Sequence, residues 1–195
     1  LADRAQIYAF VEKVASTQID ILVNCAGVRE VQKVYDLDPE EWRRVIDINL
    51  NGPFYCAREA VLRMRKTGGG SIVNIASVAG MMGLTHRPAY NSSKHGIIGL
   101  TKVTALENAT TGVTANAICP GWVLTPLVQA QVDARAKQLG VSIEEATRGL
   151  LAEKEPSQQF TTPEELGELA VFLCGPASGN IRGAAWVMDG GWSAQ

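Results

Sequence analysis

The sequence has 195 residues and a formal net charge of −2, with 18 basic and 20 acidic residues mixed along the chain. Hydrophobic residues make up 46% of it, which is enough for one sizeable core, so we expect a single domain over residues 1–195. No basic run suggests nucleic-acid binding, and no apolar run approaches the ~18 residues that could cross a membrane.

Helical and strand patterns alternate through the first half of the chain. Apolar residues at helical spacing precede a β-branched run that ends in Asn24-Cys25-Ala26-Gly27, which is typical of a buried parallel strand and a tight turn. Asp38 has the features of a helix N-cap because a proline and two glutamates follow it, and Pro53 predicts a bend further along. The predicted elements are a helix over 5–15, a strand over 19–23, a long helix from 39 to about 66 and a strand over 71–76.

The second half continues the alternation but contains an extra helical pair. Capping boxes begin at Ser142 and Thr162. The predicted elements are a helix from 88 to about 108, a strand over 113–119, two amphipathic helices over 126–137 and 143–153, a helix over 163–174 and a strand over 184–188. This order predicts a parallel sheet with helices on both faces. The helical pair, within about 125–159, follows the carboxyl end of a strand, so it is either a lid over a ligand site or a plain surface excursion.

The four cysteines form no motif that would hold a metal or a redox pair. They lie far apart, without a CxxC or Cys/His cluster, in apolar or small-residue surroundings. We therefore expect no zinc site, and packed thiols in a reducing, cytoplasmic compartment. The residues concerned are Cys25, Cys56, Cys119 and Cys174.

Residues with chemical potential gather at the predicted strand ends. Ser77 directly follows a strand, and Pro120-Gly121 ends another. Tyr90 and Lys94 are four residues apart on a predicted helix, so they share one face. Because the carboxyl ends of parallel strands meet at one edge of a sheet, we expect these groups to converge there.

These motifs, in this order and spacing, resemble those of the short-chain dehydrogenase/reductase family over the whole chain. The C-terminal side is similar to bacterial D-3-hydroxybutyrate dehydrogenases in particular. The resemblance implies a Rossmann-type doubly wound sheet, transfer of a hydride between NAD and a 3-hydroxy acid, and a homotetramer. A reductase of 3-oxoacyl carrier protein, sugars or polyols is the alternative within the family. The motifs are Asn24-Cys-Ala-Gly27, Asn49, Ser77, Tyr90-Asn-Ser-Ser-Lys94 and Pro120-Gly-Trp-Val-Leu-Thr125.

The resemblance also implies catalytic roles. Tyr90 would take the substrate hydroxyl proton, and Lys94 would lower a tyrosine pKa that is otherwise about 10. Ser77 would hydrogen-bond the substrate oxygen, and Asn49 would hold a water in a proton relay to Lys94. The structural alternatives are that Ser77 only caps a turn, Asn49 only bonds its own helix, and Tyr90 only packs.

Cofactor contacts implied by the resemblance lie on three segments. They are Asn24, Ala26 and Gly27 near the adenosine, Tyr90 and Lys94 near the nicotinamide ribose, and Pro120, Gly121, Val123 and Thr125 near the carboxamide and phosphates. The family's TGxxxGxG loop is not in this sequence, and the triple glycine at 68–70 precedes a strand rather than following one. We therefore interpret the sequence as a fragment without the N-terminal strands, which leaves NADP and a catalytically inactive binding fragment as alternatives.

The expected substrate contacts depart from the 3-hydroxybutyrate dehydrogenases. That group holds the substrate carboxylate with a glutamine, a histidine, a lysine and a lid glutamine, whose places we assign here to Arg29, Ala79, Arg87 and Gln129. Arg87 keeps a positive charge, and Arg29 adds a second. We therefore expect Arg29, Arg87 and Gln129 to bind a short 3-hydroxy acid, with a larger or dianionic acid as the alternative. The other possibility is that both arginines are ordinary surface charges.

Overall fold

The computed structural model describes residues 2–14 and 18–194, which form a four-stranded parallel sheet in the order β1-β2-β3-β4. The strands are β1 (Ile21–Asn24), β2 (Gly70–Ile75), β3 (Val113–Pro120) and β4 (Ala185–Met188). Asn24 pairs with Asn74, and Ile75 pairs with Ile118, so the strands end along one edge of the sheet. The predicted parallel α/β architecture is confirmed.

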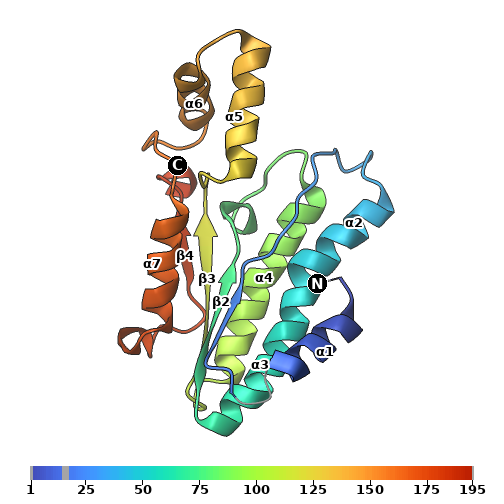
Figure 1. Cartoon of the computed structure of the whole chain (residues 1–195), viewed down its shortest axis with the longest axis vertical. Helices are drawn as coiled ribbons and strands as arrows, with labels where there is room; N and C mark the ends of the chain where they lie inside the picture. Colours follow the sequence, from blue (N-terminus) through green and yellow to red (C-terminus); the bar gives the residue numbers. More distant parts are fainter. Residues whose placement is uncertain (1, 15–17, 195) are drawn as a thin grey trace.

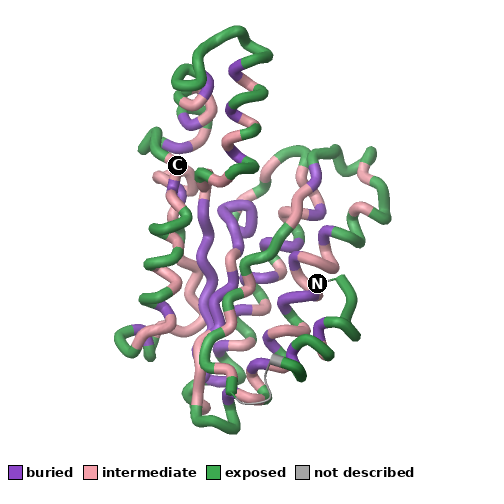
Figure 2. The backbone as a smooth tube through the Cα atoms, viewed as in Figure 1, coloured by how far each residue is buried: buried purple, intermediate pink, exposed green. Residues whose placement is uncertain are grey.

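Helices cover both faces of this sheet (Figure 1). The two faces follow from the alternation of side chains along β2. Ile72 packs with α3 (Gly52–Thr67) and α4 (Pro88–Glu107), whereas the next residue, Val73, packs with Leu173 of α7 (Pro163–Cys174). β3 is buried along its whole length between these layers (Figure 2), which fixes the position of every group at its carboxyl end.

The first strand differs from its prediction. Ile21 and Val23 are 53% and 44% exposed, although the sequence predicts a buried strand. The strand also begins two residues later, and Ile19 packs against the core formed by α3 and α4. The physical reason is its place in the sheet: within the described residues, β1 has a neighbouring strand on one side only.

The long helix predicted from residue 39 contains a wider turn where the bend was expected. α2 (Pro39–Ile46) passes through a π-helical turn, Asp47–Asn51, into α3. Asp38 caps α2 by accepting a hydrogen bond from the Glu40 N–H, 3.0 Å away. Pro53 has no N–H to give to the turn before it, so a local change of helical register is expected there.

α5 (Pro126–Leu139) and α6 (Ile143–Ala152) extend beyond the carboxyl ends of the strands (Figure 1). They pack on each other through Val132, Ala136 and Ala146. The capping boxes predicted at Ser142 and Thr162 are both present. The helical pair therefore has a small core of its own.

α1 (Arg4–Val14) lies against α3, and the predicted last residue of that helix, Ala15, falls outside the described residues. Among the described helices, none is long and apolar enough to span a membrane.

Candidate active site

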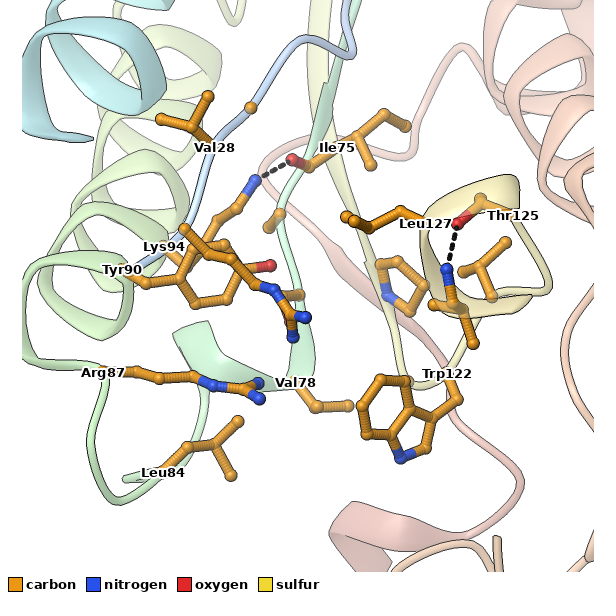
Figure 3. Close-up of a pocket in the computed structure, with 18 of the residues that line it drawn as sticks. Val28, Ile75, Val78, Leu84, Arg87, Tyr90, Lys94, Trp122, Thr125 and Leu127 are labelled. Carbon is orange, nitrogen blue, oxygen red and sulfur yellow. Dashed lines mark hydrogen bonds between the residues drawn. The ribbon is translucent and has the colours of Figure 1, made fainter. Parts of the chain in front are cut away.

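A cavity of about 270 Å³ opens at the carboxyl ends of β2 and β3 (Figure 3). It lies between the first turn of α4 and the start of α5, and the ends of β2 and β3 form one side of it. Most of the residues predicted to act together line it: Ser77, Tyr90 and Lys94 for catalysis, Gly27, Pro120, Gly121, Val123 and Thr125 for the cofactor, and Arg29 and Arg87 for the substrate.

Ser77 is positioned by the end of β2. Its backbone is extended, and its hydroxyl accepts a hydrogen bond from the Ala79 N–H at 3.1 Å, which starts a short 3₁₀ turn. The hydroxyl uses its oxygen for this cap, so its proton is free to be donated. Ser77 therefore both caps the turn and lines the cavity, and the turn holds its hydroxyl in place.

Tyr90 and Lys94 are one turn apart on α4, as predicted. The Lys94 Nζ donates to the Ile75 carbonyl oxygen at 2.7 Å and lies 5.6 Å from the centre of the Tyr90 ring (Figure 3). Lys94 is only 5% exposed, and this burial lowers its pKa to about 8. The ammonium is thus mostly charged at neutral pH, and it places a buried positive charge beside the Tyr90 ring.

Asn49 lies behind the cavity rather than in its wall. Its Oδ1 accepts from the Val28 N–H and its Nδ2 donates to the Val28 carbonyl, both at 2.8 Å, and Nδ2 also donates to Ser93 Oγ at 3.1 Å. The side chain thereby fastens the loop after β1 to α4. The side chain makes no hydrogen bond to its own helix, so the interpretation that Asn49 only bonds its own helix is wrong.

Glu30 is a buried carboxylate that the sequence did not reveal. It accepts hydrogen bonds from the N–H groups of Ala89 at 2.8 Å and Tyr90 at 3.2 Å, the first turn of α4. A carboxylate at this position satisfies helix donors and complements the positive end of the helix dipole. Glu30 therefore fixes the backbone of Tyr90. It precedes Ala89 by 59 residues, so no local pattern could have identified the contact.

A second unpredicted carboxylate, Glu155, supports the opposite wall. It is 1% exposed, and one of its oxygens accepts a short hydrogen bond from the Trp122 N–H. The other oxygen has no partner within the described residues. Burial raises the pKa of Glu155 to about 7, and the charge of Asp189 acts in the same direction. Trp122 in turn stacks on Trp192 at 6.5 Å between ring centres, and both indoles line the cavity.

Three predicted binding residues do not line this cavity. Asn24 donates to the Asn74 Oδ1 at 2.8 Å and so ties β1 to β2, and Ala26 lies outside the lining. Gln129 donates to Asp133 at 2.8 Å on the exposed surface of α5. Gln131 lines the cavity instead, which corrects the assignment of the lid glutamine. Two residues along a helix correspond to a rotation of about 200°, so an offset of two places a side chain on the opposite face.

The lining fits the nicotinamide end of a dinucleotide. Gly27 and Gly121 leave backbone exposed on two sides, Ile75 and Val123 are apolar, and Lys94 supplies a buried cation. A Cβ at Gly121 would overlap the Glu155 carboxylate and the Asp189 backbone, so only glycine permits this packing. Small and apolar walls with a few polar groups are typical of cofactor sites.

Comparisons with known sequences agree with this geometry. A family model described as enoyl-(acyl carrier protein) reductase matches residues 1–193. The chain is 56% identical over 176 residues to the D-beta-hydroxybutyrate dehydrogenase of Cupriavidus necator, covering 90% of this chain and 68% of that protein. It is 45% identical over 176 residues, with the same coverage, to the D-beta-hydroxybutyrate dehydrogenase of Rhizobium meliloti.

Solved structures show the same arrangement of elements. A short-chain dehydrogenase family protein from Francisella tularensis superimposes with a TM-score of 0.91 at 28% identity, covering all of this chain and 79% of that one. A 4-hydroxyisoleucine dehydrogenase complexed with NADH gives a TM-score of 0.83 at 30% identity, with the same coverage.

Proposed function

The chain belongs to the short-chain dehydrogenase/reductase family, and on this basis we propose that it is an NAD-dependent dehydrogenase of a 3-hydroxy acid. The expected pair is 3-hydroxybutyrate and acetoacetate. One observation carries the proposal: the 56% identity to a D-beta-hydroxybutyrate dehydrogenase extends over a cavity in which two arginines share the lining with Ser77, Tyr90 and Lys94.

The proton chemistry falls to Tyr90. Bound NAD would supply the acceptor for the hydride that leaves the carbinol carbon of the substrate. The hydroxyl proton must leave at the same time, and the Tyr90 oxygen accepts it. Lys94 holds a positive charge 5.6 Å from the centre of the Tyr90 ring. Ser77 donates a hydrogen bond to the substrate oxygen and stabilises the charge that develops there.

Lys94 and Asn49 support this step. Lys94 is anchored by the Ile75 carbonyl, so its charge cannot move away from the ring. Both N–H groups of the Asn49 side chain are used, by the Val28 carbonyl and Ser93 Oγ, so an Asn49 oxygen would hold the relay water.

Cofactor binding is proposed for the residues that line the cavity next to Lys94, with Tyr90 and Lys94 at the ribose. They are Gly27, Pro120, Gly121, Val123 and Thr125. Arg29 and Arg87 supply the positive charge that binds an acidic substrate. Their charges favour an acid over a sugar, a polyol or an uncharged acyl group.

A spectrophotometric panel tests the proposed function. NADH formation is followed with 3-hydroxybutyrate, sugars, polyols and 3-hydroxyacyl thioesters. Turnover of 3-hydroxybutyrate with Tyr90-dependent kinetics is the expected result. Turnover of neutral alcohols alone would favour the reductase alternative, whereas dinucleotide binding without any turnover would favour an inactive binding fragment.

We also propose one domain over residues 1–195, a cytoplasmic location and a homotetramer. The described residues form one sheet with a shared core, and all four cysteines are free, which suits a reducing compartment. Apolar side chains exposed on α3, α4 and α7 are available for subunit contacts: Leu62, Val103, Leu106, Val171 and Phe172. Light scattering of the purified protein tests the assembly.

A further inference from the structure

Two arginines lie together in the lining of the active-site cavity. Arg29 and Arg87 both line it and both are half-buried. Burial lowers the pKa of Arg87, and the neighbouring Arg29 guanidinium lowers it further, so the two cations repel each other. Across residues 2–14 and 18–194, neither guanidinium forms an ion pair with a carboxylate.

The acidic side chains near the cavity are already engaged elsewhere. Glu30 directs its oxygens to the N–H groups of α4. Asp189 accepts from the N–H groups of Gly191 and Ser193 at 3.0 and 2.7 Å. Glu155 is bonded beneath Trp122 and does not line the cavity. None of these three carboxylates forms an ion pair with the arginines, although the charge of Glu30 acts on Arg87 and raises its pKa against the effects of burial and of Arg29.

Lys154 lies next to one of the lining indoles, outside the lining itself. The Lys154 Nζ lies 4.9 Å from the centre of the Trp192 ring, and the charge of Arg87 helps to lower the pKa of Lys154, after its burial. The indoles of Trp122 and Trp192 and the side chain of Leu84 form an apolar wall beside these charges. Figure 3 shows Arg87 reaching between Tyr90 and Leu84 toward Trp122.

We propose that the preferred substrate is a 3-hydroxy dicarboxylate, with one carboxylate on Arg87 and the second on Arg29. The proposal rests on the dehydrogenase function proposed above and specifies its substrate. The hydride leaves C3 for NAD, the hydroxyl proton passes to Tyr90, and the C–O bond becomes a carbonyl. The products are a 3-oxo dicarboxylate and NADH, and both carboxylates are unchanged. Two anions relieve the repulsion between the arginines, whereas a single carboxylate leaves one of them uncompensated.

Binding of two unreactive analogues tests this directly. Glutarate carries two carboxylates and butyrate carries one, so calorimetry with each, with and without NADH, needs no turnover. We expect glutarate to bind at least about tenfold more tightly, since one charge-assisted hydrogen bond is enough for such a ratio. Arg29→Gln should reduce that ratio to less than about threefold. The exposed Arg43→Gln is the control and should preserve it. Equal affinities, no binding of either anion, or a preference that survives Arg29→Gln would overturn the proposal.

Kinetics separate failure of this inference from failure of the dehydrogenase function. The expected result is a higher kcat/KM for 3-hydroxyglutarate than for 3-hydroxybutyrate, and Arg29→Gln should lower the first at least about tenfold more than the second. If 3-hydroxybutyrate is the better substrate, the dicarboxylate inference fails and the dehydrogenase function stands. If neither acid is oxidised but a neutral alcohol is, both fail.

Discussion

The sheet edge and the helical pair above it differ in how firmly they are held. Ser77 and Lys94 are 8% and 5% exposed and rest on β2 and β3, which α3, α4 and α7 cover. α5 and α6 pack mainly on each other, and Leu127, Leu139 and Ile143 remain exposed. The groups that we propose for proton transfer are therefore fixed by the core. We expect α5 and α6, which make fewer contacts with the sheet, to open at lower free energy.

Replacing the proton-transfer group should give the largest effect. Tyr90→Phe removes the phenol and is expected to lower turnover by at least about a hundredfold, the usual scale for loss of a general acid or base. The melting temperature should be unchanged because α4 keeps its packing, and NAD should still bind through the other cofactor contacts. Stopped-flow or steady-state NADH formation measures turnover, and Tyr35→Phe, at a residue that is 77% exposed, is the control. A Tyr90→Phe enzyme with near-normal turnover would show that the sheet edge is not the reacting centre.

Replacing the arginines that line the cavity should have a smaller effect, on KM rather than on turnover. Arg87→Met is expected to raise KM for 3-hydroxybutyrate by about tenfold or more, which corresponds to about 1.4 kcal/mol. The effect on kcat should be smaller because the arginine binds ground and transition states alike. Arg29→Met should raise KM less. Unchanged KM in both variants would contradict an acid substrate.

Glu155 connects the two regions, since it follows α6 and its carboxylate bonds to Trp122 at the cavity. Its pKa is raised to about 7 in the folded protein, so the folded state holds the proton more tightly than the unfolded chain does. The resulting stability is fully present below the ordinary glutamate pKa, near 4.3, and is lost as pH rises through about 7. Because glutamine does not ionise, the Glu155→Gln protein should not lose this stability as pH rises.

Melting curves between pH 4 and pH 8 measure this prediction. The melting temperature of Glu155→Gln minus that of the wild-type protein should rise by a few degrees from acid to alkaline pH. Glu168→Gln, at an exposed position on α7, is the control and should follow the unchanged protein. A constant difference across this range would mean that Glu155 is ionised at neutral pH.

Features with a local signature were predicted correctly from the sequence. The caps at Asp38, Ser142 and Thr162 depend on residues within one turn, and the structure contains all three. The strand ends that carry Ser77 and Pro120 also follow from short patterns, and the parallel order of the sheet brings them together. These predictions needed no knowledge of distant contacts.

Features that depend on distant contacts could not be predicted in this way. Glu30 bonds to Ala89 across 59 residues, and Glu155 bonds to Trp122 across 33. The exposure of β1 depends on which strands lie beside it, not on its own residues. We assigned Gln129 to the cavity, but Gln131 lines it, because the sequence pattern of α5 did not establish which face of the helix meets the cavity.

Two similar helix caps provide the most sensitive test of whether the helical pair, α5 and α6, is less firmly held than the sheet. Ser142 and Thr162 each form a capping box with a glutamate three residues later, with comparable hydrogen bonds. Replacing either with alanine should cost about 1 kcal/mol of helix stability. Thr162 starts α7, whose Leu173 is buried against β2 and β3, so Thr162→Ala should lower the global melting temperature by about 2–4 °C. Ser142 starts α6, which packs on α5, so Ser142→Ala should accelerate amide exchange in α6 and leave the melting temperature nearly unchanged. Equal melting shifts would mean that the helical pair and the sheet unfold as one unit, and α5 and α6 would then be as firmly held as the sheet edge.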